Sequence, residues 1–297
     1  RFRMMEEKYG SVVLALRALK KERSAEGSAS GPRYSLFLAL ENGLEVLVQR
    51  LTDRIRFDVR VMTGAKAVSL GRTERGWRIA LQKGMPVETD LVCCALPAPA
   101  AAPLLRTAVP ELSALLEGIR YESVVTVNLV FRRADIPSFV NGFGFVVPET
   151  EKSSVIGCTF SSCKYSNRAP ENLFALRLFL GGNADPDLWR GDDSAILDLA
   201  LRELRRLAGI AAEPVACLVR RYPEAMPQYE VGHFERLAKI EAVRSGHAGL
   251  YLTGNAYRGL GLPDCIRQAR EAAQAMVLPL PVLKRRENSK TADNSPS

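Results

Sequence analysis

The chain has 297 residues, of which 47% are hydrophobic and 25% charged, and its net charge is +8 at pH 7. These values are ordinary for a folded globular protein, and the length suffices for one large domain or two interleaved ones. No apolar run approaches the roughly 20 residues that cross a bilayer, and no secretory leader is visible. We therefore expect a cytoplasmic protein, and a peripheral contact with a membrane is left open.

Residue usage also argues against two classes of partner. The basic charge is scattered along the chain, without a basic helix or a nucleic-acid motif, so we expect no nucleic-acid partner. The six cysteines form no CxxC pair and only two histidines are present, so no metal site is expected.

In chain order, the first third is predicted to mix helices and strands, with a charged loop over 20–32. The stretch 95–110 is rich in alanine and proline, a composition typical of a boundary. The predicted elements are a helix over Met4–Lys21, a helix that carries Leu44, Leu47, Val48 and Leu51, and strands over Ile55–Leu70, Trp77–Leu81 and Val87–Cys94.

The middle of the chain predicts an antiparallel sheet, with strands over Ser123–Arg132, 142–147, Val155–Ser161 and Leu173–Leu180. In the last of these strands, alternation places Phe174, Leu176, Leu178 and Leu180 on one face. Phe179 then points to the other face, together with Leu173, Ala175 and Arg177. A helix is predicted over Asp192–Ala208.

The last element is a strand, a glycine-rich bend and a helix. Leu250–Thr253 suits a strand, Gly254, Gly259 and Gly261 permit the bend, and a helix is expected from Ile266. Such a helix N-terminus presents free N–H groups and a partial positive charge. By itself this arrangement is more often plain packing than a ligand site.

The string Gly-Asn-Ala-Tyr-Arg-Gly-Leu-Gly-Leu-Pro-Asp-Cys-Ile over 254–266 resembles the C-terminal flavin-binding segment of a known family. This is the family of oxygen-dependent, FAD-containing protoporphyrinogen oxidases, which includes bacterial coproporphyrinogen oxidases. Further segments are similar to the family in the same order, so the resemblance covers the chain to about Val277. These segments are Glu6–Ser11, Asp90–Pro97, Phe143–Pro148, Gly157–Ser162, Arg168–Pro170, Phe179–Gly182 and Arg221–Tyr229.

The resemblance implies an α/β plus α+β fold: a two-domain FAD-linked oxidoreductase with an incomplete Rossmann-like FAD domain and an antiparallel-sheet substrate domain. No Gly-x-Gly-x-x-Gly unit occurs near the start, so we expect a C-terminal fragment that lacks the N-terminal dinucleotide-binding unit and is inactive in isolation. The expected segments are a helical remnant of the substrate or membrane-side domain (1–33), the central part of the FAD domain (34–113), the substrate domain (114–227), the C-terminal part of the FAD domain (228–280) and a disordered tail (281–297).

The resemblance also implies individual contacts. The backbone at Leu260, Gly261 and Leu262 would face the isoalloxazine ring of FAD, and the backbone of Ala67, where the family usually has valine, would contact the adenine end. Tyr222 would lie beside the flavin, although a core tyrosine is as well supported. Val146, Thr159 and Phe179 would contact the substrate. His233 is interpreted as structural rather than as a base, and no catalytic residue is identified.

The implied function is the oxidation of protoporphyrinogen IX or coproporphyrinogen III to the porphyrin, with FAD and molecular oxygen, in heme biosynthesis. Two alternatives remain: another flavin amine oxidase or desaturase, and a non-catalytic remnant that acts as a binding or scaffold module. Which porphyrinogen is used, whether oxygen is the true electron acceptor, and whether the protein forms a homodimer are left open.

Overall fold

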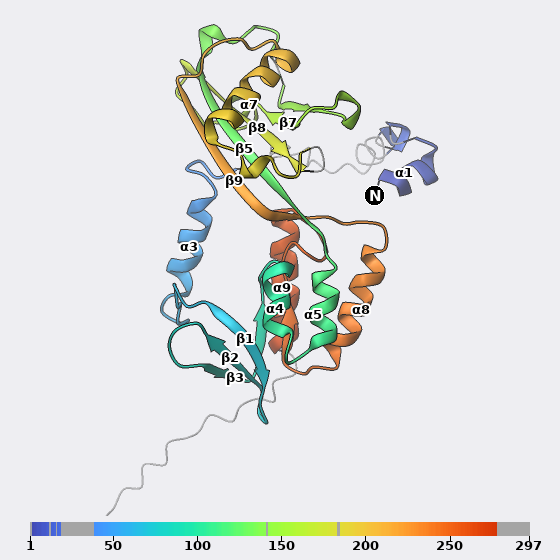
Figure 1. The fold of residues 1–297 in the computed structure, drawn as a ribbon. Helices are drawn as coiled ribbons and strands as arrows, with labels where there is room; N and C mark the ends of the chain where they lie inside the picture. The colour runs from blue at the N-terminus through green and yellow to red at the C-terminus, as the bar shows by residue number, and fades with distance from the viewer. Residues whose placement is uncertain are drawn as a thin grey trace, which may run out of the picture.

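The structure, a computed structural model, describes residues 2–11, 13–15, 17–18, 39–140, 142–182 and 185–277. Its buried side chains form two hydrophobic cores, one around the lower set of elements in Figure 1 and one around the upper sheet. The predicted loop over 20–32 and the predicted tail over 281–297 lie outside the described residues. Within the described ranges, no helix combines the length and apolar character that crossing a membrane requires.

The first core lies among two small sheets and three helices, and a fourth helix, α9, packs beside β10. Trp77, Leu105, Leu112 and Leu250 are fully buried in it. Its elements are the antiparallel strands β1 (Ala67–Arg72), β2 (Trp77–Leu81) and β3 (Val87–Thr89), the parallel pair β4 (Val92–Cys94) and β10 (Leu250–Leu252), and the helices α4 (Ala98–Leu105), α5 (Pro110–Glu117), α8 (His233–Ser245) and α9 (Leu262–Val277).

The alanine- and proline-rich stretch, whose composition is typical of a boundary, packs inside the first core, and the boundary itself stays a prediction. Half of this stretch forms α4, which has proline in its first turn, where the missing N–H costs no helix hydrogen bond. Ala98, Ala101, Ala102 and Leu105 are fully buried. Because alanine has a small side chain, α4 can pack closely against its neighbours, and the stretch lies at the centre of the first core.

The second core lies under a five-stranded antiparallel sheet with the strand order β6-β7-β8-β5-β9. One face is covered by α7, whose Ile196, Ala200 and Leu204 are buried. The elements of this part are β5 (Tyr121–Arg132), η1 (Arg133–Asp135), β6 (Gly144–Val146), η2 (Glu149–Glu151), β7 (Val155–Thr159), α6 (Ser161–Lys164), β8 (Leu173–Gly181), η4 (Leu188–Arg190), α7 (Asp193–Ala208) and β9 (Ala216–Pro227).

The alternation predicted for β8 is confirmed. Phe174, Leu176, Leu178 and Leu180 are all buried under α7, whereas Phe179 on the other face is only partly buried. The period of two along the strand therefore separates an apolar interior from a second, more exposed face.

The long strands β5 and β9 run from the second core down to the first (Figure 1). At the start of β5, Tyr121 packs against the first core, and its hydroxyl accepts a hydrogen bond from the N–H of Ala98 at 3.1 Å. Near its end, Phe131 is buried in the second core. One strand thus ties the two cores together.

A β-bulge interrupts the pairing of these two strands. Val124 pairs with Tyr222 and Glu122 pairs with Met226, so residues 223–225 of β9 stand opposite residue 123 alone. Glu224 has a φ of 45°, which few residues other than glycine adopt. The bulge separates the part of β9 in the upper sheet from the part that reaches the first core.

Two predictions near the N-terminus need correction. The strand predicted over Ile55–Leu70 begins only at Ala67, and Val59 and Val61 are 49% and 51% exposed. The alternating pattern is present, but among the described residues this segment pairs with no other strand, so it remains a series of turns. The helix predicted over Met4–Lys21 is interrupted, because α1 (Phe2–Tyr9) ends before Gly10, whose φ is 71°.

The predicted helix is confirmed as α3 (Glu45–Ile55), which carries Leu47, Val48 and Leu51, whereas Leu44 is its N-cap residue. Its apolar stripe does not face a core, since Leu44, Val48 and Leu51 are more than half exposed. Periodicity therefore predicted the helix correctly but not its packing.

Candidate functional site

The glycine-rich bend over 254–261 lies at the carboxyl ends of two parallel strands. β4 and β10 pair in register through Cys94 and Leu252, and the N–H of Thr253 donates to the carbonyl of Cys94 at 3.1 Å. In open α/β sheets, ligands bind beyond this edge of the strands. Helix α9 begins directly after the bend, so its N-terminal N–H groups are presented next to it.

Tyr229 holds the bend at two points. Its hydroxyl donates to the carbonyl of Asn255 at 2.7 Å and accepts from the N–H of Gly259 at 2.9 Å. Partial burial raises the pKa of this phenol, so it stays protonated and able to donate at neutral pH. Sequence analysis placed Tyr229 at the end of a family-like segment but missed this role, because an isolated tyrosine after a strand has no distinctive local pattern.

His233 supports the same bend from behind. It is 5% exposed, its Nε2 lies 3.0 Å from the carbonyl oxygen of Tyr257, and its ring stacks on Tyr229 with centroids 4.1 Å apart. Gln268 of α9 also contributes, since its Oε1 accepts from the N–H of Arg258 at 3.2 Å. This geometry supports the interpretation of His233 as a structural residue.

Glycine is accommodated at positions 259 and 261 of the bend for different reasons. Gly259 has a φ of 133°, and a Cβ there would lie 2.5 Å from Cγ of Asp264, so the chain itself demands glycine. At Gly261, by contrast, a Cβ would meet Asp264 Oδ2 at 3.4 Å and Pro263 Cδ at 3.6 Å, which are ordinary contacts. Nothing among the described residues requires glycine at 261, whereas a ligand that approaches the backbone closely would.

The surroundings of Gly261 suit a flat, partly apolar ligand. Leu260, Leu262 and Ile266 are 52%, 46% and 47% exposed and form an apolar border beside the N-terminus of α9. At the end of β10, the hydroxyl of Thr253 is buried and has no hydrogen-bond partner among the described residues. Apolar contacts combined with free N–H donors fit an isoalloxazine ring, which has flat faces and a polar edge, so the residues present are compatible with a flavin.

The other predicted contact residues lie on the sheet face opposite α7. Residues that pair directly across strands share a face, as do residues two apart along one strand. The register therefore places Val146, Phe179 and Tyr222 on the same side. Thr159 is on this side too, because it lies two residues after Gly157, which pairs with Val146. We call this side the open face. Its central row is Val146, Gly157, Phe179, Thr126 and Arg220, and the next row is Gly144, Thr159, Arg177, Asn128 and Leu218.

The open face is mixed in character. Val146 and Tyr222 are exposed, Phe179 is partly buried, and Arg177 is exposed with its Nε–H bonded to Oδ1 of Asn128 at 2.7 Å. The structure therefore groups Tyr222 with the predicted substrate contacts, and its place beside a flavin stays a prediction. Asn128 was missed in the sequence, because strand register decides what it contacts.

Ala67 lies apart from both groups. It is the first residue of β1, in the three-stranded sheet, and packs against the first core. No hydrogen bond between described residues joins this strand to the glycine-rich bend. The contact of Ala67 with the adenine end of FAD remains a prediction.

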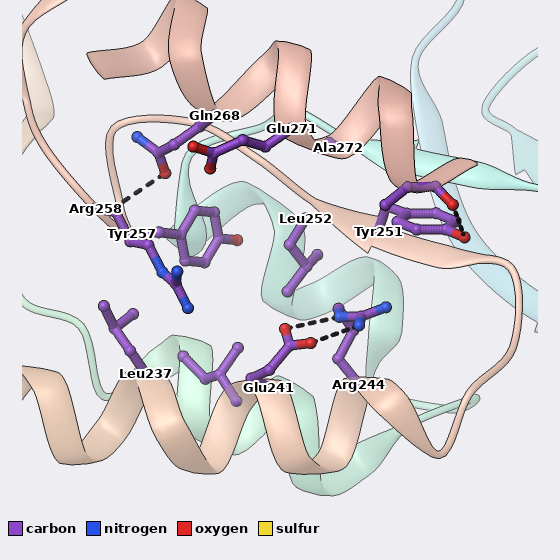
Figure 2. Close-up of a pocket in the computed structure, with 12 residues that line it drawn as sticks. Leu237, Glu241, Arg244, Tyr251, Leu252, Tyr257, Arg258, Gln268, Glu271 and Ala272 are labelled. Carbon is purple, nitrogen blue, oxygen red and sulfur yellow. Dashed lines mark hydrogen bonds and ion pairs between the residues drawn. The ribbon is translucent and has the colours of Figure 1, made fainter. Parts of the chain in front are cut away.

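A pocket of about 280 Å³ lies behind the bend, between α8, β10 and α9 (Figure 2). On its α8 side, Arg244 pairs with Glu241 of the same helix and holds the pKa of that carboxyl below its usual value. The hydroxyl of Tyr251 donates to the carbonyl of Ala275 at 3.1 Å. Tyr257 is buried, and its hydroxyl has no partner among the described residues. None of the contact residues predicted from the sequence lines this pocket.

Comparison with known proteins gives consistent results. A family model described as flavin containing amine oxidoreductase matches residues 3–277. Coproporphyrinogen III oxidase of Bacillus subtilis is 29% identical over 272 residues, which cover 91% of this chain and 57% of that protein. Human protoporphyrinogen oxidase is 28% identical over 295 residues, covering 92% of this chain and 59% of that protein.

Solved structures agree. A crystal structure from Exiguobacterium sp. 255-15, assigned as a protoporphyrinogen oxidase, superposes with a TM-score of 0.76 at 29% identity and covers 94% of this chain and 58% of that one. A putrescine oxidase superposes with a TM-score of 0.62 at 14% identity, which shows a shared fold alone. The chain thus spans less than two thirds of the length of these relatives.

Proposed function

The chain belongs to the family of flavin containing amine oxidoreductases, and from this premise we propose that the full-length protein uses FAD to oxidise a porphyrinogen to the porphyrin, in heme biosynthesis. The names of its relatives support this substrate class, at 28% to 29% identity over most of the chain. Molecular oxygen is the proposed electron acceptor.

In this proposal the flavin ring lies against the backbone of Leu260, Gly261 and Leu262, where the N-terminus of α9 stabilises its electron-rich edge. A bound flavin would supply the redox chemistry, as the acceptor of hydride. Tyr229 fixes the shape of the bend, so the N–H groups of the chain are already in place when the cofactor binds. Ala67 contacts the adenine end.

The open face is the proposed wall of the substrate site. Phe179 and Val146 offer apolar surface to a flat tetrapyrrole, Thr159 offers a hydroxyl, and Tyr222 is placed where β9 leads towards the flavin bend. The observation that carries this assignment is the register: three residues on three different strands, chosen from the sequence, share one face of the sheet.

The division into domains belongs to the same proposal. Segments 34–113 and 228–280 would supply the flavin domain and 114–227 the substrate domain. The two separate cores support this division, although the first core also includes Leu116 and Ile119.

The test uses the full-length protein, purified and assayed for bound flavin by absorbance. Coproporphyrinogen III and protoporphyrinogen IX are then supplied separately in air, and porphyrin fluorescence is followed. We expect bound flavin and oxidation of at least one porphyrinogen. A protein without flavin would favour a binding or scaffold module, and a flavoprotein that oxidises amines but neither porphyrinogen would favour an amine oxidase.

A further inference from the structure

We propose that Arg177 and Arg220 on the open face bind carboxylate groups of the substrate, and that Asn128 positions Arg177 for this contact. The inference rests on the proposed function and deepens it, because it assigns the residues that recognise the acidic side chains of a porphyrinogen.

Asn128 holds Arg177 in a defined orientation. It lies directly opposite Arg177 on one side and Leu218 on the other. Its Oδ1 accepts from Nε of Arg177 at 2.7 Å, and its Nδ2 donates to the carbonyl of Leu218 at 3.3 Å. Both ends of the amide are thereby used, so the side chain of Asn128 is fixed, and it fixes the guanidinium in turn.

The bond to Asn128 uses one N–H of a guanidinium that has five. The terminal nitrogens of Arg177 are left to pair with a planar acceptor, and guanidinium matches a carboxylate through two parallel hydrogen bonds. Of the ion pairs among the described residues, none includes Arg177 or Arg220. Glu122, an acidic residue of β5, is already paired with Arg120 at 3.1 Å.

The spacing of the two cations suits a large ligand. Arg220 lies in the row of Phe179, separated from it by Thr126 of β5, and Arg177 is in the next row. Two strand spacings and one two-residue step put their Cα atoms about 12 Å apart. One small carboxylic acid cannot reach both, whereas a macrocycle lying over Phe179 with carboxylates on different edges can.

This arrangement favours the more acidic porphyrinogen. Coproporphyrinogen III carries propionates on every pyrrole ring, whereas vinyl groups replace some of them in protoporphyrinogen IX. Coproporphyrinogen III therefore offers carboxylates to Arg177 and Arg220 in more orientations of the ring than protoporphyrinogen IX does.

The test compares Arg177→Gln, Arg220→Gln and Arg177→Lys in the full-length, flavin-loaded protein. For each glutamine variant we expect KM for coproporphyrinogen III to rise on the order of tenfold, with kcat within about twofold. Arg177→Lys should recover part of the loss, because it restores the charge but not the planar fork. The dissociation constant for coproporphyrin III, measured by fluorescence quenching without turnover, should rise in parallel.

Arg205→Gln is the matched control, since Arg205 is an exposed arginine of α7, which covers the other face of the sheet. It removes the same charge and should leave KM unchanged. Asn128→Ala tests the positioning role: it should raise KM less than Arg177→Gln, and adding it to Arg177→Gln should have little further effect.

The outcomes separate the two proposals. Normal KM and coproporphyrin binding in both glutamine variants, with flavin bound and porphyrinogen oxidised, would overturn the inference and leave the proposed function intact. A wild-type protein that oxidises no porphyrinogen would overturn both. If Arg177→Gln melts much lower than the wild type, Arg177→Lys replaces it in the comparison. A normal KM in folded Arg177→Lys, together with unchanged coproporphyrin binding in Arg220→Gln, would then count against the inference.

Discussion

Adding one methyl group to the glycine-rich bend tests whether the bend is a ligand site or only a packing turn. The change is Gly261→Ala, made in the full-length protein, with Gly259→Ala as its counterpart. Both add a Cβ within the same turn, but only one of the two positions is constrained by the chain itself. The two variants should therefore fail in different ways.

The structure provides the magnitudes. At Gly261 the new Cβ would lie 3.4 Å from Asp264 Oδ2, an ordinary contact, so we expect stability to change by no more than about 1 kcal/mol. At Gly259 it would lie 2.6 Å from Cβ of Asp264, which cannot swing aside, and the φ of 133° adds strain. Overpacking and strain together predict a loss of about 2–5 kcal/mol there.

The assay is flavin content per folded protein, together with the melting temperature. If the flavin ring approaches the backbone at Gly261, one Cβ costs about 1–3 kcal/mol of binding, which weakens flavin affinity about 5- to 150-fold while the melting temperature of the apoprotein barely moves. Full flavin retention in Gly261→Ala would refute the reasoning and leave the bend as a packing turn. A large drop in melting temperature for this variant would also contradict it.

Three further expectations follow from the same structure. Phe179→Ala should lower kcat/KM for the porphyrinogen tenfold or more. Its loss of folding stability should be smaller than the about 3–5 kcal/mol typical of a core aromatic, because Phe179 is only partly buried. A variant that melts far lower but turns over normally once folded would contradict this expectation. Tyr229→Phe should weaken flavin binding, measured by titration of the apoprotein, because it removes both hydrogen bonds to the bend; unchanged affinity would show that the stacked ring alone holds it. Glu203→Gln should destabilise by about 1 kcal/mol at neutral pH, after solvent screening is considered. The hydrogen bond from Arg206 lowers the pKa of Glu203 in the folded state. The stability that Glu203 contributes is therefore fully present above its unfolded pKa of about 4.3 and is lost as the pH falls through the lowered folded value. Urea unfolding of both proteins at several pH values measures this contribution, and a stability difference between them that grows in acid would contradict it.

Local patterns predicted some of these features and could not have predicted others. The alternation in β8 and the apolar spacing in α7 are properties of consecutive residues, so the buried faces of both were predictable. The opposition of Asn128 and Arg177 depends on which strand pairs with which, and at which register, and a single sequence does not encode that locally.

The wrong predictions have the same origin. Residues 56–66 alternate like a strand but have no partner strand among the described residues, and the apolar stripe of α3 is largely exposed. Composition describes what a segment is able to do alone, whereas its neighbours decide what it does. Tyr229 is the clearest case in the candidate site, since its two hydrogen bonds join segments that are distant in the chain.

Because of the bulge in β9, the number of residues between Tyr222 and Tyr229 decides how these two side chains are placed. Tyr222 points to the open face before residues 223–225, and Tyr229 bonds to the glycine-rich bend shortly after them. Removing one residue there would shift the following chain by about 3.3 Å and turn its side chains to the opposite side, which is more than a hydrogen bond tolerates. An extra residue beside Gly84, whose surroundings are empty, has no such consequence. The length of residues 223–225 thus sets how the proposed substrate wall is placed relative to the glycine-rich bend, and we expect a one-residue deletion there to disrupt both.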